Sequence, residues 1–393
     1  MLRSHYQVIL LGKSKRLLNA IRAKVNDKLI ELGIDTQSAI RYLDEQTLHE
    51  YVDSSPAVVV FWSTPNPGSQ IELVLSKMFR SGVGILPLVP KHKGAGERLP
   101  FGLKKINAVA AKISEESVED VSGRVLEILG LLKPARNIFI SYKREDSTAA
   151  AIQIYEYLDR KGYNVFLDTV SVGGGVNFQK ELWHRFADTE VVIMLDTANF
   201  HNSTWTTKEV GRAAAMSMGL LQIIWPNHDP ASIQTICEKL YLTPNNFKKA
   251  NFQGYGKVLN VGTVRDIGRM VEALRARSLA SRQKRLATGF LDIAAEQGIE
   301  VVMQPERYIS YKSIKDGKSI AVIPTIGVPE AFLYNKTSNL IRSLKSHRIN
   351  RSFILYDEKC VRDEWLKHLL WLDKHLPVRT LPLDSIRNNI LKI

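Results

Sequence analysis

Apolar runs of buried-strand length alternate along this chain with segments whose apolar positions recur at helical spacing. In the first third, the runs Tyr6–Leu11, Ala57–Trp62 and Val83–Leu88 predict strands. The segments from about Arg16 to Leu32 and from Ser69 to Arg80 predict helices between them. Strand, helix and strand in this order are typical of βαβ units, so a parallel sheet is expected.

The middle third repeats this alternation. Ser147 is a candidate N-cap for a helix that runs to Lys161, and Gly162 stands where a C-terminal glycine is preferred. Further helices and strands are predicted at Ile138–Ser141, Val165–Leu167, Phe178–Ala187, Val191–Leu195, Thr204–Met218 and Leu221–Trp225. These elements predict a doubly wound α/β domain. The preceding segment Leu131–Pro134 is interpreted as a linker.

The last third begins with a long basic helix, predicted from Val264 to about Gln297, which we expect to close the middle domain. A hairpin is then predicted, with its turn at Asp316-Gly317 between two short apolar runs. The remaining elements are predicted at Thr337–Ser346, Phe353–Tyr356, Asp363–His375 and Val378–Leu381. The fold class is therefore α/β, with three predicted domains at residues 1–133, 134–280 and 281–393.

The first two blocks share a spacing. Glu72 precedes Gly82 by ten residues, and Glu209 precedes Gly219 by ten, with a buried strand following each glycine. The first block is either a diverged copy of the second, which then senses or scaffolds rather than catalyses, or a coincidence of two similar folds.

Composition narrows the class of protein. No apolar run approaches the length that crosses a bilayer, no signal-peptide pattern opens the chain, and the two cysteines, Cys237 and Cys360, fit a reducing cytoplasm.

Residues 281–393 contain 19 basic and 12 acidic residues and so hold half of the net charge of +14. This excess can attract nucleic acid or a nucleotide. Because no aromatic interleaving and no nucleic-acid-binding motif is found beside it, solvated helix faces are the favoured interpretation.

Chemistry is indicated most strongly by Trp205 and Glu209. On a helix, residues four apart share one face, so the indole ring of Trp205 and the carboxylate of Glu209 would point into one pocket. Gly12-Lys13-Ser14 is not a phosphate loop, because the first glycine of that motif would fall on Gln7. The histidines form no zinc-binding pattern, and no metal or cofactor is expected.

The segment from about Arg136 to Asn227 resembles bacterial-type TIR domains. The resemblance rests on the strand and loop Phe139–Asp146, on Gly162–Asp168, on the glycine-rich loop that leads to Phe178, and on Ser203–Glu209. It implies a flavodoxin-like parallel sheet with helices on both faces, flanked here by two further α/β domains. Many members of this family cleave NAD+ at the nicotinamide–ribose bond, often in anti-phage defence, whereas others only recruit partners.

Carried over by position, the resemblance makes Glu209 the catalytic acid and Trp205 its neighbouring aromatic residue. The substrate-binding residues that it implies are Phe139, Ser141, Lys143, Arg144, Asp168, Phe178 and Trp205. Between Asp168 and Phe178 the chain has an uncharged, glycine-rich loop where NAD-cleaving relatives often carry charges, which leaves the substrate contacts of this loop open.

Plain structural roles compete with these assignments. Glu209 could pair with Arg212 one turn away, Trp205 could be a core residue, and Lys143 and Arg144 could be a solvated pair. The leading prediction is a cytoplasmic NAD+ glycohydrolase that releases nicotinamide and linear or cyclic ADP-ribose. It is expected to assemble through TIR–TIR contacts and to respond to a protein or nucleotide trigger. The alternative is a TIR scaffold without turnover.

Overall fold

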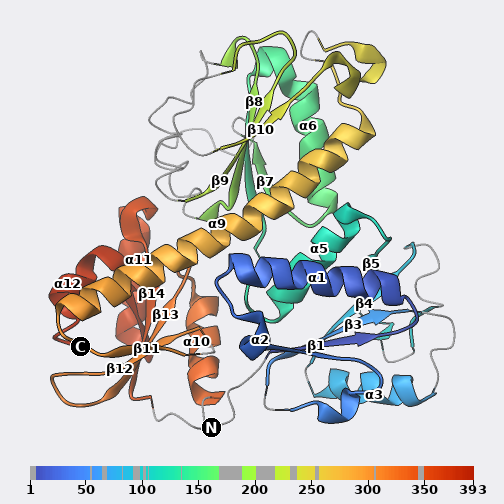
Figure 1. Ribbon diagram of the computed structural model, residues 1–393. Coiled ribbons are helices and arrows are strands. Elements are labelled where there is room, and N and C mark those ends of the chain that lie inside the picture. The colour runs from blue at the N-terminus through green and yellow to red at the C-terminus, as the bar shows by residue number, and fades with distance from the viewer. Residues whose placement is uncertain are drawn as a thin grey trace. The chain divides into compact units, whose positions relative to one another are not determined.

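The computed structural model describes the chain except for residues 1–5, 54, 64–68, 82, 92–97, 101–102, 105, 134, 168–187, 201–216, 231–236, 253–255, 305–306 and 344–348. It divides into two compact units. Unit 1 comprises Met1–Ala135 with Leu259–Arg277, and unit 2 comprises Arg136–Val258 with Ser278–Ile393. Figure 1 shows three sheets, one of them in unit 1 and two in unit 2.

The sheet of unit 1 is parallel, with strand order β2-β1-β3-β4-β5. Helices α1 and α5 cover one face and α3 covers the other (Figure 1). Its elements are β1 (Tyr6–Leu11), α1 (Lys15–Glu31), α2 (Thr36–Ala39), β2 (Ile40–Leu43), η1 (Leu48–Glu50), β3 (Ala57–Trp62), α3 (Ser69–Arg80), β4 (Gly84–Val89), β5 (Val109–Ala110) and α5 (Glu115–Ile128).

Gly12 follows β1 for a packing reason. Its φ is +106°, and a Cβ atom at this position would overlap the carbonyl oxygen of Trp62 at the end of β3. Only glycine accommodates both the backbone conformation and this close approach. The glycine before Lys13 and Ser14 is therefore explained without a phosphate.

The first sheet of unit 2 is also parallel, with strand order β10-β9-β8-β6-β7. In chain order this is the same topology as in unit 1, since the second strand flanks the first and the third, fourth and fifth follow on the other side. The elements are β6 (Asn137–Ser141), α6 (Arg144–Arg160), β7 (Asn164–Leu167), β8 (Val191–Asp196), β9 (Gly219–Ile224), β10 (Glu238–Tyr241), η4 (Pro244–Asn246) and η5 (Lys248–Ala250).

Helix α6 ends as predicted but begins earlier. Gly162 has a φ of +82°, and the N–H groups of Gly162 and Tyr163 bond to the carbonyls of Asp159 and Leu158, which closes the helix end. The predicted N-cap at Ser147 is wrong, because the helix begins at Arg144 and Ser147 lies at a kink inside it. The Ser147 hydroxyl donates to the carbonyl of Lys143, 3.3 Å away, so it satisfies local backbone at the kink instead of capping a helix.

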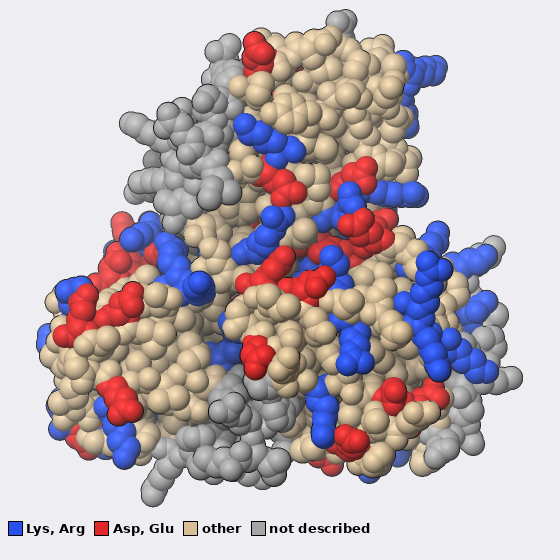
Figure 2. Space-filling view, viewed as in Figure 1, with Lys and Arg blue, Asp and Glu red and all other residues tan. Residues whose placement is uncertain are grey.

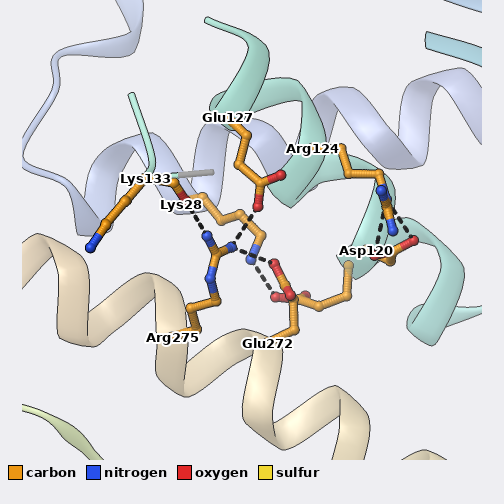
Figure 3. A network of polar contacts seen from close by, with 8 residues as sticks. Lys28, Asp120, Arg124, Glu127, Lys133, Glu272 and Arg275 are labelled. Carbon is orange, nitrogen blue, oxygen red and sulfur yellow. Dashed lines mark hydrogen bonds and ion pairs between the residues drawn. The ribbon is translucent and has the colours of Figure 1, made fainter. Parts of the chain in front are cut away.

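Helix α9 (Val261–Glu296) belongs to both units, since its residues up to Arg277 group with unit 1 and those from Ser278 with unit 2. A buried charge network holds the first part in unit 1 (Figure 3). Arg275 is fully buried, and its guanidinium lies 2.8 Å from Glu127 of α5 and 3.4 Å from Glu272. It also donates to the carbonyl of Lys133, in the segment that we interpreted as a linker, so this segment is part of the packed unit.

The third sheet is mixed, with order β11-β12-β13-β14-β15. β12 and β13 form the predicted hairpin, and β13, β14 and β15 are parallel. Residues of α9 and α12 pack on one face, and residues of α10 and α11 pack on the other. The elements are β11 (Val301–Met303), β12 (Ile309–Lys312), β13 (Ser319–Pro324), α10 (Ala331–Ser343), β14 (Arg351–Tyr356), η6 (Glu358–Cys360), α11 (Asp363–His375), β15 (Val378–Pro382), η7 (Leu383–Ser385) and α12 (Ile386–Asn389).

Charged side chains of both signs are interspersed over the face drawn in Figure 2. Lys and Arg side chains gather in unit 1 beside the first turn of α1, where Lys13, Lys15 and Arg16 are exposed. Among the helices in the described part of the chain, none is long and apolar enough to span a bilayer.

Candidate functional site

The first sheet of unit 2 has a topological switch point between β6 and β8. From β6 the chain passes to β7 on one side and later to β8 on the other, and all of these strands are parallel. The segments that leave the carboxyl ends of β6 and β8 therefore turn away from each other. In sheets of this order, ligands bind in the crevice that this divergence leaves.

Strand β6 brings two predicted site residues toward this edge. Phe139 lies in mid-strand, opposite Phe166 and Val192, and is only 2% exposed, so it belongs to the sheet core. Ser141 is the last residue of β6 and is fully buried. Its hydroxyl has no hydrogen-bond partner among the described residues, so an uncompensated polar group stands at the switch point.

Lys143 and Arg144 follow directly, at the start of α6. Lys143 is the N-cap residue, and its ammonium lies 3.4 Å from the carboxylate of Glu145. A hydrogen bond from the backbone N–H of Glu145 to its own carboxylate lowers the pKa of Glu145, and the charge of Lys143 lowers it further. Arg144 is exposed in the first turn. Both predicted cations thus lie at the expected edge, and Lys143 already has an acidic partner.

The same helical turn is bonded to the segment after β8. Asp146 accepts a hydrogen bond from the hydroxyl of Thr197 at 2.7 Å and one from the amide of Asn199 at 3.1 Å. These two bonds join the segments on either side of the switch point. Asp146 is the last residue of the loop motif Phe139–Asp146, and this place in the motif is the sequence signal for a site residue that was not among the predicted ones.

A second polar network lies beside this one, at the end of β8. Asp196 is fully buried and accepts hydrogen bonds from Gln222 at 2.6 Å, and its other oxygen lies 3.0 Å from Nε2 of His228. The thiol of Cys237 lies 3.6 Å from the Gln222 side-chain oxygen, and burial raises its pKa. A carboxylate that ends an apolar strand was the only sequence signal for this group.

Four predicted site residues, Asp168, Phe178, Trp205 and Glu209, lie outside the described residues, as does the glycine-rich loop. The described edge brings together Ser141, Lys143 and Arg144, and adds Asp146 and the Asp196 network to them. Within the described ranges, no group of three or more His, Cys, Asp or Glu side chains could hold a metal ion.

Residues 138–240 match the family model described as TIR domain. The chain carries a TIR domain. The match covers the whole parallel sheet from β6 to β10 except for one residue at each end, so the switch point described above belongs to it. The predicted family and the predicted α/β fold are both confirmed.

The similar solved structures do not assign a fold or a function to the parts of the chain outside the TIR domain. A putative LacI transcriptional regulator from Bacteroides fragilis is 10% identical, with 56% of this chain and 78% of that chain covered, at a TM-score of 0.19. A periplasmic sugar-binding protein from Legionella pneumophila is 9% identical, with 72% and 95% covered, at a TM-score of 0.19. TM-scores this low carry no inference about fold or function. No curated protein matches the chain.

Proposed function

We propose that the TIR domain cleaves NAD+ at the nicotinamide–ribose bond, with Glu209 as the catalytic acid. The match of residues 138–240 to the TIR domain carries the proposal. A parallel sheet with a switch point between β6 and β8, and the cations Lys143 and Arg144 beside it, support the location of the site.

The chemistry explains why an acid and an aromatic ring are needed. When neutral nicotinamide leaves the cationic ribosyl pyridinium, positive charge develops on the ribose. A carboxylate at Glu209 would hold the ribose hydroxyls through charge-assisted hydrogen bonds and stabilise this charge electrostatically. Trp205 or Phe178 would pack against a planar ring of the substrate.

Lys143 and Arg144 would bind the pyrophosphate. Guanidinium and ammonium groups are the usual partners of phosphate oxygens, and the carboxyl end of a parallel strand is the usual place for them. Lys143 would have to exchange the carboxylate of Glu145 for a phosphate oxygen, because its ammonium lies 3.4 Å from that carboxylate. Phe139 and Ser141 would then support the floor of this site from within the strand.

Assembly through TIR–TIR contacts would complete the site, and a protein or nucleotide trigger acting through the flanking domains would control it. This proposal fits a cytoplasmic effector of bacterial anti-phage immunity. We therefore expect low activity in the dilute protein and higher activity as it assembles.

The direct experiment incubates the purified chain with NAD+ over a range of protein concentrations and follows nicotinamide release together with the oligomeric state. Release that rises with assembly supports the proposal, and chromatography then separates linear from cyclic ADP-ribose. If no nicotinamide is released in any assembly state, the alternative function as a TIR scaffold without turnover is favoured.

A further inference from the structure

The second part of helix α9 contacts both the TIR domain and the third sheet, all of them within unit 2. The hydroxyl of Ser278 donates to the carbonyl of Ser217 at 3.0 Å, and the guanidinium of Arg282 donates to the carbonyl of Thr189 at 2.8 Å. Two turns further along, Phe290 packs in the core of the third sheet. Spacings of four and eight residues place these side chains on one face of the helix. One helical face therefore joins the two domains.

The contacts of α9 with the TIR domain lie at the amino ends of strands β8 and β9. Thr189 comes two residues before β8, and Ser217 comes two residues before β9. The first residues of these strands, Val191 and Gly219, are partners in the parallel register. The proposed NAD+ site lies at the carboxyl ends of the strands. Helix α9 is therefore bonded to the edge of the sheet opposite to the site.

The third sheet is bonded to the same edge. The N–H of Val328, in the segment between β13 and α10, donates to the carboxylate of Asp188 at 3.1 Å. The carbonyl of Asp188 accepts a hydrogen bond from the side chain of Asn137 at the start of β6. Adjacent residues of the TIR domain thus bind α9 and the third sheet. We call these three contacts the latch: Ser278–Ser217, Arg282–Thr189 and Val328–Asp188.

A buried charge cluster lies at the centre of the latch. Arg282 is 5% exposed, and burial lowers the pKa of its guanidinium, whereas the charges of Glu190, Asp188 and Asp357 raise it. Asp357 is paired with Arg285 at 2.5 Å. The attraction between buried charges is largely offset by the cost of removing them from water, so such a cluster adds little net stability. A stimulus of modest free energy can therefore open the latch.

Strand β8 connects the latch to the proposed site. Its amino end follows Thr189 and Glu190, and its carboxyl end leads to Thr197, whose hydroxyl bonds to Asp146 beside the switch point. All six residues of β8 are buried. Because a close-packed interior transmits displacements, a change at the latch reaches the switch point through this strand.

We propose that the latch holds the TIR domain in its unassembled state, and that opening of the latch frees the amino edge of β8 and β9 for TIR–TIR contacts. This inference rests on the proposed function, in which assembly completes the NAD+ site. An edge that is bonded to α9 and the third sheet cannot at the same time bind a second TIR domain. Contacts that exist only in the unassembled chain shift the equilibrium toward that state. A ligand that separates the third sheet from the TIR domain is then an activator.

The test measures self-association of the full chain by sedimentation velocity over a range of concentrations, without NAD+. Asp188→Ala removes the acceptor of the Val328 N–H, and we expect this variant to assemble at a concentration about tenfold lower than the wild type. Ser278→Ala removes one neutral hydrogen bond of the latch and should shift assembly in the same direction by about threefold. This milder variant keeps the test decisive if Asp188→Ala does not fold.

Asp292→Ala is the matched control, because it removes an exposed carboxylate from α9 outside the latch. It should assemble as the wild type does. The association of Asp188→Ala should reverse on dilution, since it arises from folded TIR domains.

The proposal is overturned if neither latch variant shifts assembly, or if either of them needs a higher concentration than the wild type. Association that does not reverse on dilution would also contradict it, because unfolded chain would then be responsible. Nicotinamide release is measured separately. Easier assembly without release in any state would reject NAD+ cleavage and retain the latch, whereas release by the wild type with unchanged assembly in both variants would reject the latch alone.

Discussion

The hydroxyl of Thr197 donates a 2.7 Å hydrogen bond to the carboxylate of Asp146, and this bond joins the segment after β8 to the first turn of α6. Asn199 bonds to the other carboxylate oxygen at 3.1 Å. The two segments border the switch point of the TIR domain on opposite sides. One carboxylate therefore fixes the relative position of the segments between which a ligand would bind, and it does so next to Lys143 and Arg144.

Removing the carboxylate of Asp146 tests whether the separation of these two segments matters for NAD+ cleavage. Asp146→Ala breaks both bonds, so the two segments are no longer held at a fixed separation. We expect kcat/KM for NAD+ cleavage to fall about tenfold, or ~1.4 kcal/mol in transition-state stabilisation. Asp159→Ala, an exposed position near the other end of α6, is the control and should leave the kinetics unchanged. Equal kinetics in the two variants would contradict a positioning role for Asp146.

Because the guanidinium of Arg275 is buried, we expect its removal to lower the free energy of unfolding strongly. Arg275→Met leaves the carboxylates of Glu127 and Glu272 without this partner in a buried site, which commonly costs about 3–5 kcal/mol. We expect a corresponding drop in the free energy of unfolding, measured by urea denaturation. Arg269→Met is the matched control, because Arg269 pairs with Glu115 near the surface and should contribute less than about 1 kcal/mol.

A second arm of this experiment isolates the charge effect. If the stability loss arises from unpaired carboxylates, adding Glu127→Gln and Glu272→Gln to Arg275→Met should recover part of it. A triple variant less stable than Arg275→Met alone would mean that the acids stabilise unit 1 through other contacts.

Tyr311 predicts a difference in stability at alkaline pH. Burial raises the pKa of Tyr311 to about 12, partly opposed by Arg351. The folded chain holds this proton more tightly than the unfolded chain. The protonated phenol therefore makes its full contribution to the free energy of unfolding below pH about 10, and this contribution is lost as the pH rises through 12. Tyr311→Phe removes this loss, so its stability relative to the wild type should increase across that window, by up to about 1.4 kcal/mol per pH unit.

At neutral pH the same variant has a second expected outcome. The Tyr311 hydroxyl is buried and has no hydrogen-bond partner among the described residues, so its removal should be neutral or stabilising by about 1 kcal/mol. Thermal unfolding at a series of pH values measures both effects, with Tyr241→Phe as the exposed control. A parallel pH dependence in the wild type and Tyr311→Phe would rule out a buried, pKa-shifted phenol.

Strands buried on both faces are the elements that this sequence predicts best. β1 and β3 have the predicted bounds, because a central parallel strand is a continuous apolar run. The edge strands β2 and β10 have four residues each and include exposed charged positions, so no apolar run announces them. The topology common to the two parallel sheets agrees with the shared glutamate–glycine spacing, and the origin of the first block as a diverged copy stays a prediction.

The features that could not be predicted from the sequence depend on contacts between residues far apart in the chain. The sequence pattern predicts helix α9. Nothing in the neighbouring sequence indicates that Arg275 pairs with Glu127, about 150 residues earlier. This pairing lies in unit 1, to which the first part of the helix belongs. The candidate site divides in the same way. Lys143 and Arg144 follow a recognisable strand, whereas the partners of Asp146 and Asp196 come from other segments of the chain.

Nicotinamide release by the assembled wild type, by Glu209→Gln and by Glu72→Gln tests the central claim most directly. The two substitutions make the same chemical change, since Glu72 occupies the corresponding position before a glycine and a strand in unit 1. The proposed function predicts release by the wild type and by Glu72→Gln, and a loss of at least about 100-fold in Glu209→Gln. Release by Glu209→Gln at the wild-type rate would contradict it.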